Sequence, residues 1–496
     1  MELQLKNREI SYLEPVILEC RNLEQTQEVR VPEGLPDIER VLGCWGQLIL
    51  RGKEWRTDSV TVSGGLMLRL LYGPDGAGTV QILDSWVPFQ AKWELPRDTR
   101  DGRILVQPLL RFLDARSLSP RKILVRCGIG LNLMALVPEN LSFPEPDAVP
   151  EDVQLLQKTV PLRLFDQAGE KSFAMEEPLS APGMDLTGQK VFYSSAQPVL
   201  TEQKVVGDKI AFRGAVNLHV LFCGPEGALE GRDFTFPFSQ LAELDRACGS
   251  EAEVDIQVCV TSLELEEGGD GSKVVKASFT AQYAVSDVTK IQVVEDGYST
   301  LRPLKLNRQL LPATSILEQR WETLTGEAAL PGEVHSEVDM ALFWEFPLWD
   351  PIPGGYRLES AGTIGLLSQQ EQGTDGFTAV WQGSTEVRTG EDIRLTVTGM
   401  TPGTVQLNPG ARKITMDLAV HLTMLSKDGL NVVSSMELGE PVDKDLSRPS
   451  LILRRAGDAG LWELAKESGS TMAAIAQANG LTEEPTKGQM LLIPLS

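Results

Sequence analysis

Residues 63–76 read SGGLMLRLLYGPDG, a small-residue start followed by an apolar strand pattern and a turn-forming Gly-Pro-Asp-Gly. A related stretch, RGAVNLHVLFCGPEG, occupies residues 213–227, and a weaker copy begins with SAGTIGLL at residues 360–367. The corresponding glycines, Gly64, Gly214 and Gly362, are 150 and 148 residues apart. A period of this length indicates tandem units, because solenoid repeats are much shorter.

A second feature follows each copy of the first. Arg121, Ser272 and Arg412 each precede a lysine and a long strand-like run. Short β patterns and Gly/Pro punctuation dominate between these landmarks, and the best helical candidates are Ile38–Leu42 and Gln240–Asp245. We therefore expect a mainly β protein with three tandem β-rich domains, each a sandwich or a barrel, over residues 1–140, 150–298 and 299–443. Residues 138–150 are expected to form a Pro- and Glu-rich connector after the first domain.

Residues 449–496 predict a small α+β module with the order strand, helix, helix, strand. Residues 451–455 can form the first strand, and apolar residues at helical spacing from Leu461 end at Gly469. Ser470 is a plausible N-cap for a second helix, which Asn479 and Gly480 would end. The closing strand would run from residue 488 to residue 494.

This segment resembles a lysin-motif (LysM) domain. The matching residues are Gly457-Asp458, Leu461-Trp462, Asn479-Gly480-Leu481, Gly488-Gln489 and Leu492-Ile493-Pro494. The resemblance implies two helices on one side of a two-stranded sheet, and a groove for N-acetylglucosamine-containing glycans. The expected groove or partner-binding residues are Gly457, Asp458, Ala459, Gly460, Leu461, Trp462, Asn479, Gly480, Leu481 and Gln489.

The LysM pattern departs from its family at one place. Ala459-Gly460 stands where the family usually has a single Ser or Thr, so a hydroxyl is missing from the expected groove. Loss of one well-placed polar group from a binding site lowers the binding free energy by about 1 kcal/mol. The sequence leaves two roles open for Trp462: packing on the first helix, or lining the groove.

The order of the whole chain resembles the clostridial sporulation coat-associated (SPOCS) repeat proteins. The stretch VPEGLPDI at residues 31–38, the repeated glycine-led strands and the terminal LysM-like segment carry this resemblance. It implies a non-enzymatic scaffold in the mother-cell cytoplasm at the forespore surface. The LysM module would there dock the coat morphogenetic ATPase or another coat protein. The alternative is a cell-wall protein that binds peptidoglycan or N-acetylglucosamine.

The composition excludes some classes of binding partner. A net charge of −23 argues against nucleic acid, which is bound through clustered Lys and Arg, and against anionic lipid. The first residues lack the apolar core of a signal peptide, and no apolar run reaches the length of a transmembrane helix, so we expect a cytoplasmic protein. The six cysteines show no Cys-x-x-Cys spacing and are expected to be buried free thiols.

The sequence offers no catalytic or metal-binding constellation. It lacks a phosphate-binding Gly-rich loop and a Gly-x-Ser-x-Gly turn, so we expect neither an enzyme nor a cofactor. His219 and His421 lie in strand patterns, where each is expected to point outward or make one hydrogen bond. The aromatic stretch at residues 343–353 includes Trp344, Phe346 and Trp349. It is either a core strand with a folded loop or a second partner-binding surface.

Overall fold

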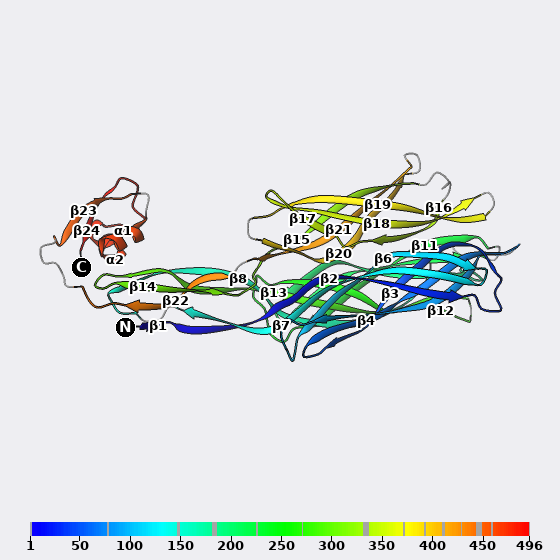
Figure 1. The fold of residues 1–496 in the computed structure, drawn as a ribbon, viewed down its shortest axis with the longest axis horizontal. Coiled ribbons are helices and arrows are strands. Elements are labelled where there is room, and N and C mark those ends of the chain that lie inside the picture. The colour runs from blue at the N-terminus through cyan, green and yellow to red at the C-terminus, as the bar shows by residue number, and fades with distance from the viewer. Residues whose placement is uncertain are drawn as a thin grey trace.

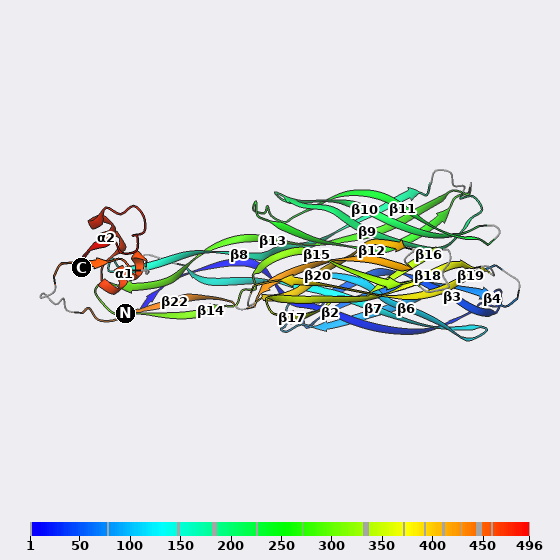
Figure 2. The same cartoon turned by 90° about the horizontal axis from the view of Figure 1, so that it is seen from above.

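The computed structural model describes residues 2–76, 79–145, 149–180, 186–224, 227–269, 271–330, 337–370, 373–390, 393–408, 412–427, 429–442, 449–457 and 460–495. Figures 1 and 2 show an elongated molecule with a broad head of long strands at one end, a narrow stalk, and a small helix-containing module at the other end. The N-terminus lies beside the stalk and the C-terminus lies in the module (Figure 1). The fold is mainly β, as the sequence predicted.

The strands fall into three consecutive sets, which we call strand sets 1, 2 and 3. Set 1 contains β2 (Lys6–Arg30), β3 (Ile38–Trp55), β4 (Ser59–Pro74), β5 (Gln81–Glu94), β6 (Arg103–Ser119) and β7 (Lys122–Glu145). Set 2 contains β8 (Val153–Pro178), β9 (Lys190–Val206), β10 (Lys209–Cys223), β11 (Leu229–Glu243), β12 (Glu253–Glu267) and β13 (Lys273–Ser299). Set 3 contains β14 (Leu304–Leu311), β15 (Ile316–Ala329), β16 (Glu337–Trp344), β17 (Leu348–Ile352), β18 (Gly355–Gln370), β19 (Gly373–Arg388), β20 (Ile393–Asn408), β21 (Lys413–Ser426) and β22 (Leu430–Leu438).

The same antiparallel pairing recurs in the three sets. Each has a three-stranded meander, β3-β4-β5, β9-β10-β11 or β16-β18-β19. Each also has an outer hairpin, β6-β7, β12-β13 or β20-β21, whose second strand pairs with β2, β8 or β15. One bridge, between Leu13 and Phe165, joins sets 1 and 2 into a six-stranded sheet, β12-β13-β8-β2-β7-β6. In set 3, β15 also pairs with β19, so meander and hairpin form one sheet with β17 at its side.

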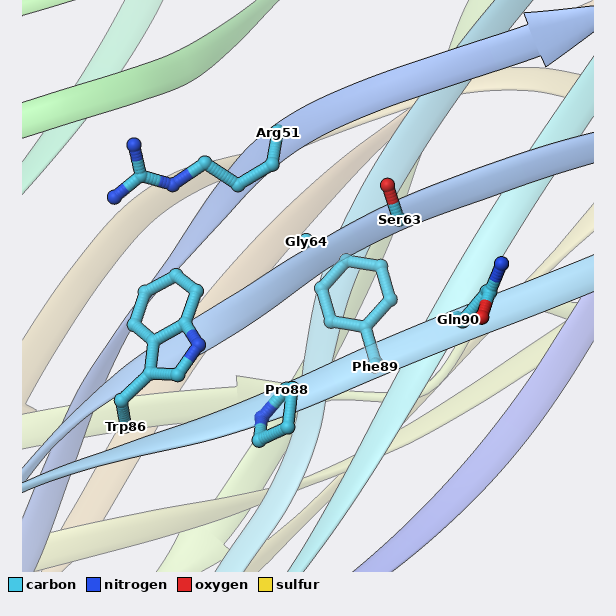
Figure 3. Close-up of a pocket in the computed structure, with 7 residues that line it drawn as sticks. All are labelled: Arg51, Ser63, Gly64, Trp86, Pro88, Phe89 and Gln90. Carbon is cyan, nitrogen blue, oxygen red and sulfur yellow. The ribbon is translucent and has the colours of Figure 1, made fainter.

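The repeated glycines have one structural reason in all three sets. A Cβ atom on Gly64 would lie 2.3 Å from the carbonyl oxygen of Ile49 on the preceding strand. The corresponding distances are 2.1 Å for Gly214 and 2.3 Å for Gly362. Each glycine also sits opposite an aromatic residue of the following strand, as Figure 3 shows for Gly64 and Phe89. Any side chain at these positions would push neighbouring strands apart, so the sequence pattern marks a close backbone approach.

Each strand set has a main hydrophobic core, and set 2 has a second, smaller one that includes Phe212 and Tyr283. The central residues of the main cores include Leu68 in set 1, Val220 in set 2 and Ile364 in set 3, all fully or almost fully buried. The two helical candidates were wrong. Residues 38–42 begin β3, and residues 240–243 end β11, because both pair along neighbouring strands rather than forming a local turn.

The stalk consists of ribbons that continue the sheets of the head. The first half of β2 pairs with the end of β7, the first half of β8 pairs with the end of β13, and β14 pairs with β22. β1 (Glu2–Gln4) adds to the other side of β22. Apolar residues from all three ribbons, including Phe143, Ile291 and Val432, form a common core. Residues 138–145, expected as a connector, are therefore strand.

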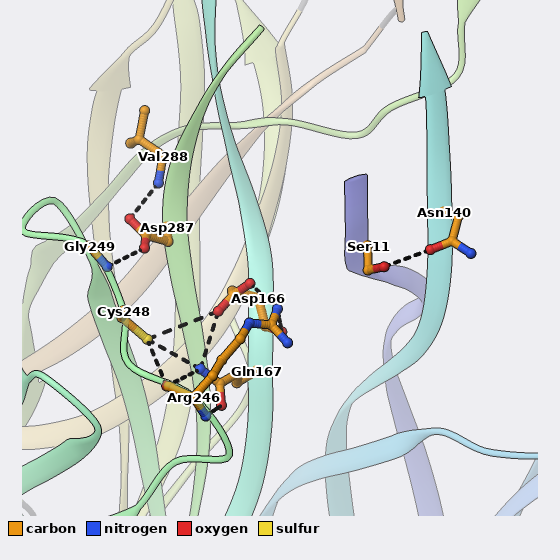
Figure 4. Close-up of polar contacts among 9 residues, drawn as sticks. All are labelled: Ser11, Asn140, Asp166, Gln167, Arg246, Cys248, Gly249, Asp287 and Val288. Atoms are coloured by element: carbon orange, nitrogen blue, oxygen red, sulfur yellow. Dashed lines mark hydrogen bonds and ion pairs between the residues drawn. The ribbon is translucent and has the colours of Figure 1, made fainter. Parts of the chain in front are cut away.

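Each ribbon bends where it leaves the head, and an extra residue interrupts the pairing there. The register shifts at Val16 in β2, at Asp166 in β8 and at Leu317 in β15. Such bulges bend a strand and increase its twist. In Figure 4 the bulge at Asp166 is held by Arg246, whose guanidinium contacts its carboxylate. Gln167 exchanges two hydrogen bonds with the backbone of Arg246, at 2.9 and 3.2 Å, which fixes the bend.

The six cysteines are all free thiols, as expected. The expectation that they are buried is correct for three of them, Cys127, Cys223 and Cys259. Cys44 and Cys248 are partly exposed, and Cys20 is exposed. No helix among the described residues is long and apolar enough to cross a membrane.

Candidate functional site

The C-terminal module contains a two-stranded sheet and two helices. The strands β23 (Leu451–Arg455) and β24 (Met490–Pro494) are antiparallel, and α1 (Leu461–Ser468) and α2 (Met472–Asn479) lie between them in the chain. Gly469 and Gly480 end the helices in the left-handed conformation, with φ of 65° and 59°. Thr471, not Ser470, caps α2, because its side chain accepts a hydrogen bond from the Ala474 N–H.

The residues expected to form a groove in the module have mostly structural roles. Asn479 donates to the carbonyl oxygens of Ile475 and Leu492, at 2.8 and 2.6 Å, and accepts from the Leu492 N–H. Its amide therefore ties α2 to β24. The side-chain amide oxygen of Gln489 accepts from the Thr486 N–H at 3.0 Å. Leu481 is half-buried and packs against the module core.

The loop before α1 is described only in part. Gly457 and Gly460 are exposed, whereas Asp458 and Ala459 lie outside the described residues. Gly460 is the N-cap position but has no side chain to cap the helix. Instead, the Glu484 carboxylate accepts a hydrogen bond from the Leu461 N–H at 2.9 Å. A carboxylate at a helix N-terminus stabilises the helix by neutralising its dipole and its unpaired N–H groups.

Trp462 faces the stalk. Its indole N–H donates to the Asp296 carboxylate of β13 at 2.9 Å, and its ring packs edge-on against Tyr298 with centroids 4.9 Å apart. The Lys466 ammonium contacts the same Asp296 oxygen at 2.6 Å. Burial disfavours the Asp296 anion, but the hydrogen bonds from Lys466 and Trp462 hold its pKa below the usual range. The side chain of Trp462 is only 9% exposed.

A second contact seals the same junction. The Tyr298 hydroxyl donates to the Ser470 carbonyl oxygen at 2.8 Å, in a buried position. Burial raises the pKa of Tyr298 to about 12. Tyr298 and the half-buried Leu156 of β8 join Leu461 and Leu464 of α1 in one apolar cluster. The module is thus held on the end of the stalk by polar and apolar contacts together.

The outer face of the module sheet is open and apolar. The helices pack on the face that carries Leu491 and Ile493. On the opposite face, Leu453 and Leu492 form a cross-strand pair, and Leu451 and Met490 lie diagonally beside them. These four side chains are between 39 and 59% exposed. We call them the module apolar face.

The aromatic stretch of set 3 is divided between interior and surface. Phe346 is buried and lies against set 1, since a Cβ atom on Gly130 would be 2.7 Å from its ring. Trp344 is half-buried and packs beside the core of set 3. Trp349 lies on β17 next to Leu348, and both are exposed. Of the three residues expected at a second interface, Trp349 is the most exposed, at 36%.

A shallow pocket of about 670 Å³ lies on the meander of set 1 (Figure 3). Trp86, Pro88, Phe89 and Gln90 of β5 line one side. The Arg51 guanidinium lies over the Trp86 ring, 5.3 Å from its centroid. This cation–π contact already occupies a ring face that a ligand could stack on.

Polar side chains join the three sets in the middle of the head. Gln107 of set 1 exchanges two hydrogen bonds with the Met400 backbone of set 3, at 2.6 and 3.0 Å. Gln282 of set 2 does the same with the Val106 backbone, at 2.8 and 3.1 Å. In both cases a side-chain amide bonds the N–H and C=O groups of one residue on an edge strand, as the backbone of a neighbouring strand would. Gln257 of set 2 also donates to the Thr398 carbonyl oxygen of set 3. Gln107 and Gln257 lie 43 residues after Gly64 and Gly214, respectively, so this equivalence was visible in the sequence, whereas the role of Gln282 was not.

The two strand histidines join sets 2 and 3 and do not simply point outward. His219 lies between Asp233 and Asp339, at 2.7 Å from an oxygen of each. Burial disfavours the charged imidazole, but the two carboxylates outweigh it and raise the pKa of His219 to about 10. His421 of β21 is buried 3.2 Å from Asp255 of β12, and that carboxylate raises its pKa despite burial. Asp233 lies opposite His219 on the next strand, whereas Asp339 and Asp255 are far from their histidines in sequence, which hid the contacts between sets from the sequence pattern.

Comparison with known proteins identifies one part of the chain. A family model described as SipL, SPOCS domain, matches residues 189–266, which run from the start of β9 almost to the end of β12. The match supports a SPOCS domain within set 2 and a sporulation-related role for the chain. No curated protein and no solved structure shows a significant match.

Proposed function

We propose that this protein is a non-enzymatic structural adaptor in assembly of the endospore coat. The three strand sets form the scaffold, and the C-terminal module, a LysM-like domain, docks a coat protein. The SPOCS match supports the sporulation context. The resemblance of the whole chain to SPOCS-repeat proteins favours the coat morphogenetic ATPase as the partner, and the mother-cell side of the forespore surface as the place.

The module apolar face is the observation that carries this proposal. Leu451, Leu453, Met490 and Leu492 present four large apolar side chains on one ribbon face, while the helices cover the other. Contiguous exposed apolar surface is typical of protein–protein interfaces. The face is also held firmly, because Asp296 and Tyr298 fix α1 to the stalk.

The glycan alternative has less support from the geometry. Sugar recognition needs polar groups that are free to bond the hydroxyls of a ligand, together with an accessible aromatic face. In the module, Trp462 is buried against the stalk, and the side-chain amides of Asn479 and Gln489 bond within the module. The exposed glycines Gly457, Gly460 and Gly480 offer only backbone groups.

Binding of the full chain to purified coat ATPase tests the proposal. Leu453→Asp places a charge in the centre of the module apolar face and should weaken binding at least tenfold. Leu241→Asp is the matched control, because Leu241 on β11 is 58% exposed, similar to the 59% of Leu453, but lies in the head. Equal affinities for wild type and Leu453→Asp would overturn docking through this face. Saturable micromolar binding of chito-oligosaccharides, with no binding of the ATPase, would instead support the wall-protein alternative.

A further inference from the structure

A large cleft lies where the three strand sets meet. Its volume is about 960 Å³. β10, β11, β15 and β21 contribute a few lining residues. Most of the lining comes from six strands: β3 and β6 from set 1, β9 and β12 from set 2, and β16 and β20 from set 3. All six strands lie at the edges of their sheets. The cleft is therefore a product of the assembled head, and it is separate from the module and its apolar face.

Carboxylates dominate the charged groups around the cleft. Asp233, Asp255, Asp339 and Glu202 all line it. Three of these carboxylates are near histidines: His219 lies between Asp233 and Asp339, and His421 pairs with Asp255. Glu202 forms an ion pair with Arg213. The three aspartates face only two histidines, so the cleft keeps an excess of negative charge that attracts cations and repels anions.

Two buried acceptors in the cleft wall have no donor among the described residues. Asp339 is 4% exposed, and its Oδ1 contacts His219 and the Met340 N–H, whereas its Oδ2 has no hydrogen-bond partner. Gln257 is 9% exposed and donates to the Thr398 carbonyl, but its Oε1 has no partner. A buried acceptor without a donor costs about 1–3 kcal/mol, so both atoms favour a ligand that brings N–H groups.

Aromatic rings complete the lining. Trp45 and Tyr193 lie with ring centroids 6.3 Å apart, and Trp344 lines the wall from β16. Trp321 is half-exposed and lies over His421. Aromatic faces attract ammonium and guanidinium groups, and their apolar surface accommodates the alkyl stem of Lys or Arg. Carboxylates, unpaired acceptors and aromatic rings together select a primary ammonium or a guanidinium on an alkyl chain.

The shape of the cleft favours an extended peptide as the carrier of this group. Residues 195–203 of β9 line the cleft along the edge of the β9-β10-β11 sheet. The Ala196 N–H on this edge bonds the Gln47 side chain and Pro198 has no N–H, so residues 199–203 are the part of the edge that an added strand could pair with. An edge strand can pair with an added strand through its outward backbone groups. A chain with a net charge of −23 also attracts basic segments over a distance. We propose that this cleft binds an extended basic segment of a partner protein, with a Lys or Arg side chain directed at Asp339.

Calorimetric titration of the full chain with the peptide acetyl-(Val-Lys)3-amide tests this site at physiological salt. We expect saturable one-to-one binding that is lost when the lysines are acetylated. Asp339→Asn keeps the shape of the side chain and should weaken binding at least tenfold. Glu359→Gln removes the same charge from an exposed position on β18 and should leave the affinity unchanged.

Three outcomes would overturn the proposal: equal binding of the acetylated peptide, equal effects of Asp339→Asn and Glu359→Gln, or no saturable binding. Binding of spermidine as tight as that of the peptide, with the same loss in Asp339→Asn, would assign the site to free amines instead. Hydrogen exchange of the wild-type chain gives a measurement that does not depend on how the variant folds. The peptide should protect the outward amides of residues 199–203, which exclude Pro198 and the Ala196 N–H that already bonds Gln47, and their unchanged exchange would contradict strand addition.

Discussion

Replacement of His219 by Gln tests the ion pair that joins sets 2 and 3. In the folded chain His219 lies 2.7 Å from both Asp233 and Asp339, and its pKa is raised to about 10. The ordinary value, about 6.5, applies after unfolding. Because the folded pKa is the higher one, the stabilisation is fully present below pH 6.5. It is lost as the pH rises from there through 10.

The magnitude follows from the size of this shift. Each pKa unit corresponds to about 1.4 kcal/mol, so the loss between pH 6.5 and 10 is up to about 4 kcal/mol. In His219→Gln, two carboxylates face each other without the imidazolium between them, and a broken buried ion pair costs about 3–5 kcal/mol. The variant should therefore be much less stable than wild type at pH 6.5. The difference in unfolding free energy between wild type and His219→Gln should become smaller towards pH 10.

Urea unfolding of both proteins at several pH values between 6.5 and 10 measures this difference. Other alkaline titrations, such as those of Tyr and Lys, occur in both proteins and cancel in the comparison. Asn217→Gln serves as a control, since Asn217 lies two residues away on the same face of β10 and does not titrate. A stability difference between wild type and His219→Gln that stays constant across this pH range would refute the assignment of a charged His219.

Two further changes test the packing of the scaffold and of the module. Gly214→Ala would place a Cβ atom 2.1 Å from a carbonyl oxygen and should destabilise the chain by about 1–3 kcal/mol in urea unfolding. Gly224→Ala, with the nearest atom at 3.7 Å, should have little effect, and equal effects would contradict the close-approach argument. Asp296→Ala removes the acceptor of the Trp462 indole and the partner of Lys466. It should raise amide exchange in α1 about tenfold without changing exchange in β10, and unchanged exchange in α1 would show that the junction does not hold the module.

The sequence predicted features whose cause is local. Gly64, Gly214 and Gly362 mark one strand position because only glycine fits there, and Gly469 and Gly480 end helices through their own backbone conformation. The mainly β class followed from turn residues and strand patterns in the same way. These features depend on residues that are close in the sequence, so they can be predicted without knowing which distant residues pack together.

Features that depend on distant partners were missed. Pro138 and Pro144 suggested a connector, yet both lie in β7 beyond Leu136, where pairing with β6 ends and only β2 is a neighbour. A proline is tolerated on such a free edge. The position of Phe346 against Gly130 likewise depends on how the sets pack, which no local pattern encodes.

The same separation between local and distant partners applies at the candidate site. The residues of the expected groove were chosen from spacing within the module. Trp462 is buried there by Asp296 and Tyr298, which lie more than 160 residues earlier in the chain. The central cleft combines residues from all three sets, so no single stretch of sequence could indicate it.

The ribbons of the stalk have a mechanical consequence. Each strand set begins and ends in the stalk, and the strands there run along the long axis of the molecule (Figures 1 and 2). A pull between module and head would load the hydrogen bonds of a ribbon side by side, in shear, rather than peel them one after another. The tension would be divided among three ribbons that share a core. Such a stalk should resist extension along its long axis better than one ribbon alone.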